Sequence, residues 1–135
     1  MYSFETKIRV RYAETDQMSF VYYGVYAQYY EVGRVELLRS LGVTYKELEE
    51  IGFALPVVNM DISYKKPAYY DDELTIKTSI KELPAAKIVF HYETFNSKRE
   101  LLNIGRVALV FIYKDTGKAC LAPKVVINKL KEKLV

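Results

Sequence analysis

Hydrophobic and polar side chains alternate along the first part of the chain and then change to a longer period. From residue 4 to residue 12 every second side chain is Phe, Thr, Ile, Val or Tyr, which is typical of a strand with one buried face. Between about residues 23 and 41 the apolar positions recur at steps of three and four, which predicts one long amphipathic helix. Its buried stripe is expected to consist of Tyr26, Tyr30, Gly33, Leu37 and Leu41, flanked by Ala27 and Leu38.

The surface and the end of this helix carry further signals. Glu31 and Arg34 are spaced three residues apart and can form an ion pair on the helix surface. Glu36 and Arg39 have the same spacing. Gly42 is expected to end the helix, because glycine readily adopts the left-handed conformation that follows many helices.

Beyond residue 42 the chain is expected to form short helices and mostly strands. Thr44, with Glu47 three positions later, is the capping pattern of a helix over residues 44–50. Period-two alternation then returns, which indicates strands. The predicted elements are strands over 58–65, 74–81, 88–92 and 105–113, a hairpin turn in "KDTGK", a short strand near 119–121 and a last helix after Pro123.

The order of these elements is one strand, one long helix and then an antiparallel meander. Strands do not alternate with helices, so the fold class is α+β rather than α/β, with the long helix covering one face of a curved antiparallel sheet. The chain has 135 residues and no internal repeat or linker, and a single domain over residues 1–135 is expected. The strand from Arg106 to Tyr113 is apolar on both faces, so a second subunit or another layer is expected on the face that the helix leaves free.

Composition narrows the range of functions. No apolar run approaches the roughly 20 residues that cross a bilayer, and "MYSFETKIRV" lacks the apolar core of a signal peptide, so no membrane association and a cytoplasmic location are expected. Cys120 is the single cysteine, which excludes an intramolecular disulfide and leaves no zinc-ligand spacing. The formal net charge is +3 and the basic residues are spread along the chain, which disfavours nucleic-acid binding.

The motifs of several enzyme classes are missing. The sequence contains no phosphate-binding loop, no dinucleotide-binding glycine pattern and no G-x-S-x-G nucleophile elbow. His91 is the single histidine and lies inside a predicted strand, so it is a weak candidate for the base that a serine or cysteine nucleophile needs. An enzymatic reaction would therefore depend on carboxylates and backbone donors, without an organic cofactor or metal.

Asp16 is the carboxylate best placed for such a reaction. It lies between the first strand and the long helix, just ahead of a stretch in which five of the thirteen tyrosines fall between Tyr22 and Tyr30. The start of a helix offers unpaired N–H groups and a partial positive charge, which can stabilise an oxyanion on a carbonyl. An aspartate before a helix is also a common turn or cap residue. From the residues alone both interpretations stay open.

Residues 12–42, "YAETDQMSFVYYGVYAQYYEVGRVELLRSLG", resemble the signature of the 4-hydroxybenzoyl-CoA thioesterase family of hotdog-fold proteins, which includes the YbgC-type acyl-CoA thioesterases. The segment "YKKPAYYDDELTI", residues 64–76, resembles the family's second strand, its proline turn and the acidic residues that open the next strand. The order of elements is similar over essentially the whole chain, and the N-terminal motif is the specific part.

The resemblance implies hydrolysis of acyl-CoA with a short-chain or aromatic acyl group, at a dimer interface. It implies two subunits that join their sheets side by side, as a dimer or as two dimers paired into a homotetramer. It assigns Asp16 as nucleophile or general base on the thioester carbonyl, and the backbone N–H of Tyr23 as the donor that polarises this carbonyl. The residues that it places with the substrate are Tyr22, Gly24, Tyr26 and Glu31.

The sequence also departs from the family pattern. Ser19 stands where many members carry Gly, Val25 where many carry Asn or Ser, and Tyr23 where some carry His. The loop "ELPAAK" lacks the Arg that binds CoA phosphates in some relatives. Two alternatives to an acyl-CoA thioesterase therefore stay open, namely a thioesterase acting on acyl-carrier protein and a non-catalytic module that binds acyl thioesters.

Overall fold

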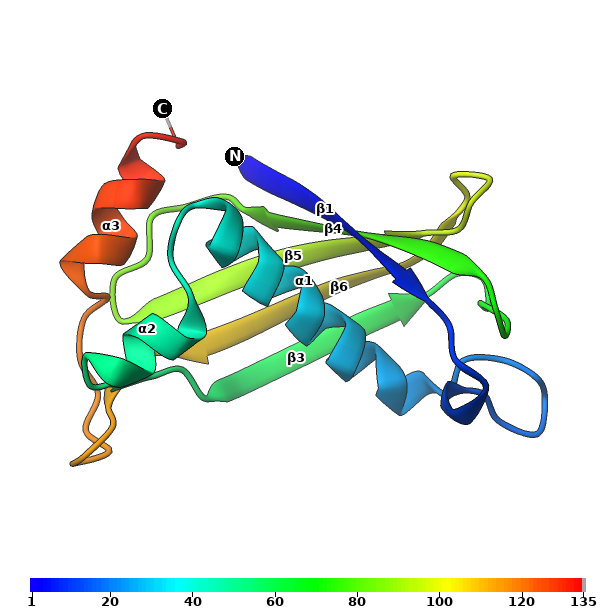
Figure 1. Cartoon of the computed structure of the whole chain (residues 1–135), viewed down its shortest axis with the longest axis horizontal. Coiled ribbons are helices and arrows are strands. Elements are labelled where there is room, and N and C mark those ends of the chain that lie inside the picture. The colour runs from blue at the N-terminus through cyan, green and yellow to red at the C-terminus, as the bar shows by residue number, and fades with distance from the viewer. Residues whose placement is uncertain (135) are drawn as a thin grey trace.

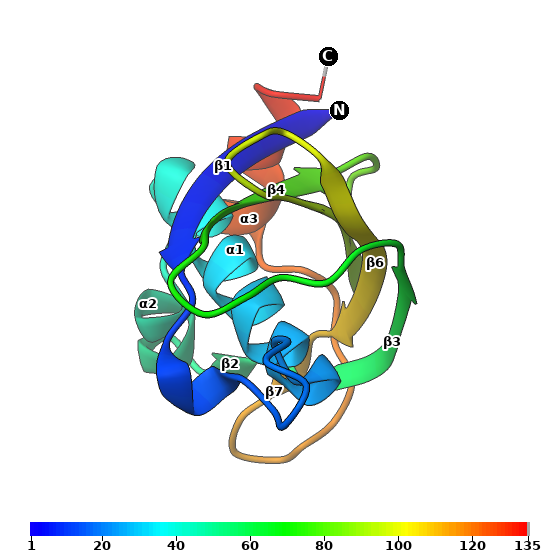
Figure 2. The same cartoon turned by 90° about the vertical axis from the view of Figure 1, so that its right-hand side faces the viewer.

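A five-stranded antiparallel sheet curves around one long helix, α1 (Tyr26–Ser40), in the computed structural model, which describes residues 1–134 (Figure 1). Viewed from the end at which α1 begins, the sheet forms an arc from β1 to β3 around the helix (Figure 2). The expected α+β class and the curved sheet wrapped around one long helix are confirmed. In spatial order the strands are β1 (Tyr2–Arg9), β4 (Glu73–Ile80), β5 (Lys87–Phe95), β6 (Leu101–Val110) and β3 (Val57–Tyr64).

Smaller elements close the end of the sheet that lies away from the start of α1. The short helix α2 (Tyr45–Glu50) is capped by the Thr44 hydroxyl, which accepts from the Glu47 N–H, as predicted. Helix α3 (Lys124–Lys131) buries Val126 and Leu130 against the core. Strands β2 (Phe53–Ala54) and β7 (Ile112–Tyr113) form a separate two-stranded ribbon that the sequence pattern did not predict. None of the helices within residues 1–134 combines the length and hydropathy needed to cross a membrane.

The strand order differs from the predicted meander at one point. β3 does not pair with β4, the next strand in the chain, but with β6 at the far edge of the sheet. The connection between β3 and β4 instead pairs with the loop that carries Asp16, through a Val21 N–H to Ala68 O bond of 2.9 Å and a bridge between Phe20 and Tyr69. A tight hairpin cannot form because this connection crosses the end of the sheet.

Three other predicted strands also differ in extent from those observed. The strand predicted over 105–113 is interrupted at Phe111, which separates β6 from β7, and the strand predicted near 119–121 is reduced to a bridge between Ile112 and Ala119. Tyr12, predicted on the buried face of the first strand, is 77% exposed. The reason is that β1 ends at Arg9 and the chain turns before it reaches Tyr12.

The predicted stripe of α1 forms the centre of the core. Tyr26, Tyr30, Gly33, Leu37 and Leu41 are all buried, and α1 packs mainly against β1 and β4. Gly42 follows the helix with φ +84°, which confirms its predicted role.

The tyrosines of this helix are held by specific partners. The Tyr30 ring stacks on Tyr92 with 4.0 Å between ring centroids, and its hydroxyl donates to Asn103 Oδ1 at 2.5 Å. Three of the five clustered tyrosines thus serve the core, whereas Tyr22 and Tyr23 are exposed.

One of the two predicted ion pairs on α1 does not form. Arg39 pairs with Glu36 at 3.3 Å, as expected. Arg34, in contrast, makes no ion pair with Glu31 or with any other carboxylate among residues 1–134. Arg34 is only 7% exposed, because its position adjoins the buried stripe and the guanidinium turns inward, away from the helix surface.

Candidate active site

A tight loop between β1 and α1 presents Asp16. Thr15 and Val21 form a bridge at its base, and the Asp16 N–H donates to Phe20 O at 2.8 Å. Asp16 Oδ1 accepts from the N–H groups of Met18 and Phe20, at 2.9 and 3.3 Å. Asp16 Oδ2 has no hydrogen-bond donor among residues 1–134, and the side chain is exposed. The carboxylate therefore stabilises its own turn through one oxygen and keeps the other oxygen available.

The backbone of this loop accounts for the glycine that many members of the family carry at the position of Ser19. Ser19 adopts φ +66°, a conformation that glycine reaches without steric cost and that other residues rarely adopt. The expectation of glycine at this position in related proteins is consistent with this geometry.

The start of α1 lies directly after the loop. A 3₁₀ turn over Tyr23–Val25 leads into the helix, and the Val25 N–H is used by a bond to Tyr22 O. Within residues 1–134 the N–H groups of Tyr23 and Gly24 donate to no acceptor. These two donors stand at the positive end of a fifteen-residue helix. They form the hydrogen-bonding surface that an oxyanion requires.

A groove runs between the start of α1 and the edge strand β3. It is open because α1 packs mainly against β1 and β4, on the other side of the arc. The Tyr64 hydroxyl donates to Tyr23 O at 3.3 Å across this gap. The part of about 350 Å³ beside the helix is lined by Tyr23, Gly24, Ala27, Met60, Ile62 and Tyr64. An adjoining hollow of about 240 Å³ is lined by Phe20, Val21, Tyr23, Tyr26, Tyr64, Lys65, Lys66 and Pro67.

The predicted site residues occupy different parts of this region. Tyr23 and Gly24 line the groove, and Tyr26 forms the buried wall of the adjoining hollow. Burial, together with the nearby Tyr64 and Asp72, raises the pKa of Tyr26 to about 12.

The other two predicted substrate residues lie outside the groove lining. Tyr22 is 46% exposed and packs against the Tyr23 ring with 4.6 Å between centroids. Glu31 is an exposed residue one helical turn beyond Ala27 and does not line the groove. The structure thus brings the Asp16 loop, Tyr23, Gly24 and Tyr26 to one end of the molecule, whereas Glu31 lies further along α1.

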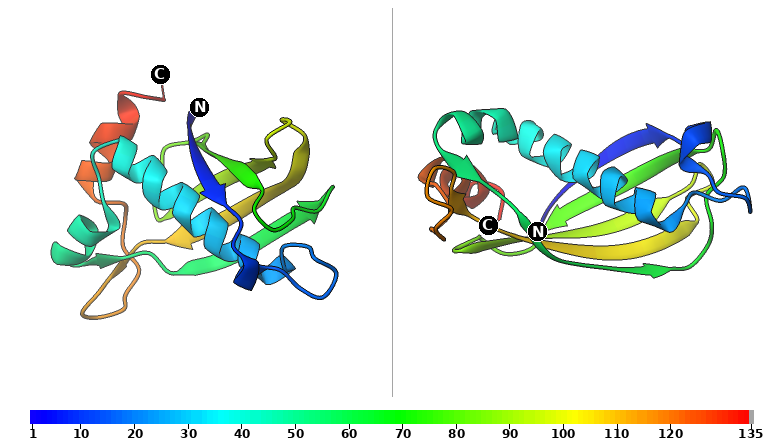
Figure 3. Two further views of the ribbon diagram at one scale, coloured as in Figure 1. Left: turned by 45° about the vertical axis from the view of Figure 1, so that its right-hand side comes forward. Right: turned by 90° about the horizontal axis from the view of Figure 1, so that it is seen from below.

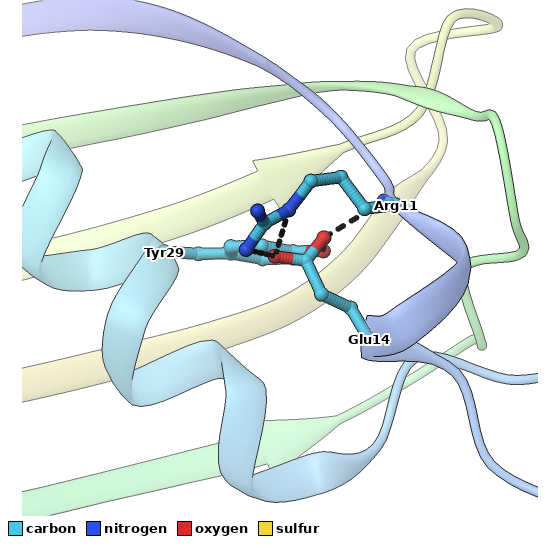
Figure 4. A network of polar contacts seen from close by, with 3 residues as sticks. All are labelled: Arg11, Glu14 and Tyr29. Atoms are coloured by element: carbon cyan, nitrogen blue, oxygen red, sulfur yellow. Dashed lines mark hydrogen bonds and ion pairs between the residues drawn. The ribbon is translucent and has the colours of Figure 1, made fainter.

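Glu14 is a second carboxylate near the site, and the sequence pattern did not single it out. Its side chain is only 10% exposed and accepts from Arg11, two residues beyond β1, and from Tyr29 on α1 (Figure 4). Burial alone would raise the pKa of Glu14, but the bonds from the Arg11 N–H, the Tyr29 hydroxyl and the Arg11 guanidinium together lower it. Burial, together with the hydrogen bond to Glu14 and its negative charge, raises the pKa of Tyr29. In the sequence, the only signal that could have pointed to Glu14 is its place two residues before Asp16 in "YAETD".

His91 and Cys120 take no part in this site. His91 lies on the outward face of β5 between Ser79 and Arg106, on the opposite side of the sheet from α1. Burial and the cations Lys81 and Arg106 lower its pKa. Cys120 packs partly buried against the core. Nowhere in residues 1–134 do three His, Cys, Asp or Glu side chains gather as a metal site.

The curved sheet, the central helix and the open groove at the start of that helix define a hotdog-type α+β protein. Residues 10–130 match the Thioesterase-like superfamily, so the chain belongs to this family. The matched region contains the Asp16 loop, all of α1 and the strands that line the groove.

Individual relatives agree with this assignment. The chain is 42% identical over 101 residues to "Putative acyl-CoA thioesterase YneP" of Bacillus subtilis, which is 75% of this chain and 73% of that protein. It is 32% identical over 116 residues to "Acyl-CoA thioesterase YbgC" of Haemophilus influenzae, covering 85% and 83% of the two chains. The crystal structure of a DHNA-CoA thioesterase from Staphylococcus aureus superposes with a TM-score of 0.91 at 33% identity, covering 98% of this chain and 93% of that one.

Proposed function

We propose that this protein is an acyl-CoA thioesterase in which Asp16 is the catalytic carboxylate. The observation that carries the proposal is the free Asp16 Oδ2 in the loop that leads directly to the two unpaired N–H groups at the start of α1. The relatives named above are thioesterases for CoA substrates, which supports CoA as the leaving group.

In the proposed reaction the N–H groups at the start of α1 bind the thioester carbonyl, and the Asp16 carboxylate then acts on it. The thioester carbonyl oxygen accepts from the N–H groups of Tyr23 and Gly24, which stabilise the oxyanion that develops during attack. As a general base, Asp16 takes a proton from a water molecule whose oxygen attacks the carbonyl carbon. The carbon–sulfur bond then breaks, and Asp16 returns the proton to the CoA sulfur. As a nucleophile, Asp16 would form a mixed anhydride and release CoA thiolate before water completes the hydrolysis.

The groove between α1 and β3 holds the acyl group in this proposal. Gly24 and Tyr26 lie beside the reacting carbonyl in this proposal. Tyr22 and Glu31, which lie outside the groove lining, contact the parts of the substrate that extend beyond the groove. The predominantly apolar lining, which includes Ala27 and Met60, suits an aliphatic chain or an aromatic ring.

The proposal includes assembly and location. Among the described residues β3 is hydrogen-bonded on one side only, so its free edge can pair with a second copy, closing the groove at a dimer interface. Two such dimers form the proposed homotetramer. A cytoplasmic protein agrees with the single cysteine, which packs against the core instead of forming a disulfide.

Replacing Asp16 by Asn tests the catalytic assignment. Asparagine keeps a side-chain oxygen that can accept from the Met18 and Phe20 N–H groups, so the loop is expected to stay folded. It has no negative charge to attack a carbonyl or take a proton from water. Asp16→Asn is therefore expected to lower kcat by about 100-fold or more, while the melting temperature and acyl-CoA affinity stay near those of the parent.

Asp72→Asn is the matched control, because Asp72 also accepts a backbone N–H in a turn, from Tyr69 at 2.9 Å. Its kcat is expected to stay close to that of the parent. The kcat of the parent and of both variants is measured by free-thiol release from a panel of acyl-CoA and acyl-carrier-protein thioesters. An unchanged kcat in Asp16→Asn would show that Asp16 only stabilises its turn and is not catalytic. Turnover of carrier-protein thioesters alone supports the carrier-protein alternative, and binding without turnover supports the non-catalytic module.

A further inference from the structure

Glu14 connects the Asp16 loop to helix α1 through its side chain. Glu14 Oε1 accepts from the Tyr29 hydroxyl at 2.9 Å and from the Arg11 N–H at 2.8 Å. Glu14 Oε2 accepts from Arg11 Nε and from the terminal guanidinium nitrogen, both at 3.2 Å. Figure 4 shows the carboxylate held between Tyr29 on α1 and Arg11 beside it. The Glu14 side chain thus connects the segment that follows β1 and the base of the loop to the first turns of α1.

The backbone of Glu14 makes a second connection to the site. Its carbonyl oxygen accepts from the Tyr22 N–H at 2.9 Å, so Glu14 and Tyr22 close the base of the loop on the two sides of Asp16. Tyr22 immediately precedes Tyr23, whose N–H is the proposed oxyanion donor. The position of Asp16 relative to this donor therefore depends on the two attachments of Glu14.

We propose that Glu14 is a positioning residue that holds the Asp16 carboxylate in reach of a carbonyl bound at the start of α1. This inference rests on the proposed thioesterase function and adds a residue to it. Hydrolysis requires that the attacking oxygen and the N–H donors meet the same carbonyl group, and a displacement of about 1 Å can cost on the order of 100-fold in rate. An exposed loop has little packing of its own to supply this precision.

Glu14 itself is unsuited to react with the substrate. Both of its oxygens already accept two hydrogen bonds each, from Arg11 and Tyr29. Its side chain is 10% exposed, whereas Asp16 is open to solvent. The arrangement keeps Glu14 ionised and fixed, which suits an anchor and not a proton carrier.

Tyr29→Phe tests this role with the least disturbance to folding. It removes only the hydroxyl that links α1 to Glu14 and leaves the ring in the core. Tyr30→Phe is the matched control, because Tyr30 is the next residue of α1, is equally buried and donates its hydroxyl to Asn103 on β6, away from the loop. A merely structural role predicts similar behaviour from the two variants, since both lose one buried hydrogen bond.

The kinetic measurement separates kcat from KM. Tyr29→Phe is expected to lower kcat by about 10-fold with KM within about 2-fold of the parent, because it disturbs the attacking group and not the groove. Tyr30→Phe is expected to keep kcat within about 2-fold of the parent, even if its melting temperature falls as much as that of Tyr29→Phe. Glu14→Gln, which places an N–H₂ group against the donors of Arg11, is expected to lower kcat further than Tyr29→Phe. Equal kcat values for Tyr29→Phe and Tyr30→Phe overturn the proposal.

Amide hydrogen exchange provides a second readout that needs no substrate. The N–H groups of Asp16 and Tyr22, bonded to Phe20 O and Glu14 O, report on the loop and its base. Their exchange is expected to be at least about 10-fold faster in Tyr29→Phe than in Tyr30→Phe. Equal exchange contradicts the anchoring role even if the parent is an active thioesterase. If the parent hydrolyses no thioester, the proposed function fails, and faster exchange in Tyr29→Phe alone still supports Glu14 as the anchor of the loop.

Discussion

At the scale of single residues, the tyrosine-rich stretch after Asp16 divides into two kinds of side chain. Tyr26, Tyr29 and Tyr30 are at most 3% exposed and belong to the core, whereas Tyr22 and Tyr23 are 46% and 65% exposed. The division follows the helical period, since the buried members lie on the side of α1 that faces the sheet. The aromatic cluster is therefore mainly a packing feature, and the backbone at its start provides the proposed chemistry.

Tyr23 provides a test of that distinction. Its ring packs on Tyr22 at the surface, while its N–H is free to polarise a carbonyl. Tyr23→Phe is expected to keep kcat within about 3-fold of the parent, because the backbone donor is unchanged. Steady-state hydrolysis of acyl-CoA measures the effect. A loss on the order of 100-fold, typical of removing a true oxyanion donor or general acid, would assign the role to the hydroxyl instead.

Glu14 is expected to make the stability of the fold depend on pH. Because its hydrogen bonds hold the pKa of Glu14 below its ordinary value in the folded state, the ionised form stabilises the protein at pH values above the unfolded pKa. This contribution is lost as the pH falls through the lowered folded pKa. The melting temperature of Glu14→Gln should lie below that of the parent at pH 7, and the difference should shrink below about pH 4, the ordinary carboxyl range.

Glu50→Gln, at an exposed position of α2, controls for the loss of one negative charge. Thermal unfolding of the three proteins between pH 7 and about pH 3 provides the comparison. A gap between Glu14→Gln and the parent that stays constant over this range would contradict a stabilising role for the ionised carboxyl.

At the scale of elements, the contact between α1 and the sheet depends on two glycines. A methyl group at Gly33 would overlap the Thr78 side chain, and one at Gly105 would overlap the Tyr30 ring. The absence of a side chain on α1 at one point and on β6 at the other allows the helix to approach the sheet closely. Both positions are buried, so neither neighbour can move freely into solvent.

Gly33→Ala tests this close approach. In an open helix this substitution would stabilise by about 1 kcal/mol, because alanine has the higher helix propensity. Here the added methyl group meets a short, fully buried side chain, and the free energy of unfolding is expected to fall by about 1–3 kcal/mol. Urea denaturation measures the change. A variant more stable than the parent would mean that Thr78 and the sheet yield to the methyl group at little cost.

At the scale of the whole molecule, the sheet has an open edge and an uncovered face. β3 has no strand beyond it among the described residues, and α1 and α3 leave the outward face of the sheet free (Figure 3). Exposed apolar side chains lie at the start of this edge, since Val57 and Val58 are 47% and 55% exposed. An eight-residue edge strand of this kind is a template for pairing with another chain.

Light scattering is expected to show an oligomer at micromolar concentration, with a dimer as the smallest unit. Val58→Lys should shift the population toward monomer, because association would bury a charge where the parent buries an apolar side chain. Val125→Lys, at an exposed position of α3, is the control and should leave the mass unchanged. A monomeric parent would exclude the proposed assembly.

Most elements of this fold were predictable because they depend on local periodicity. The long helix, its buried stripe, its end at Gly42 and the strands β1, β3, β4 and β5 all follow from spacings of two or of three and four residues, which decide the side of an element that is apolar. The loop position of Asp16 ahead of the helix follows in the same way. The resemblance of residues 12–42 to a thioesterase family is also a property of the linear chain.

Only the tertiary structure decided which distant residues meet. The placement of β3 beside β6, the inward turn of Arg34 and the groove along α1 have no local signature, because each depends on packing between separate elements. The bonds from Tyr29 to Glu14 and from Tyr30 to Asn103 span 15 and 73 residues, and neighbouring tyrosines with the same local pattern thus acquire different roles. Periodicity determines that a side chain is buried, whereas its partner is determined by the path of the chain through space.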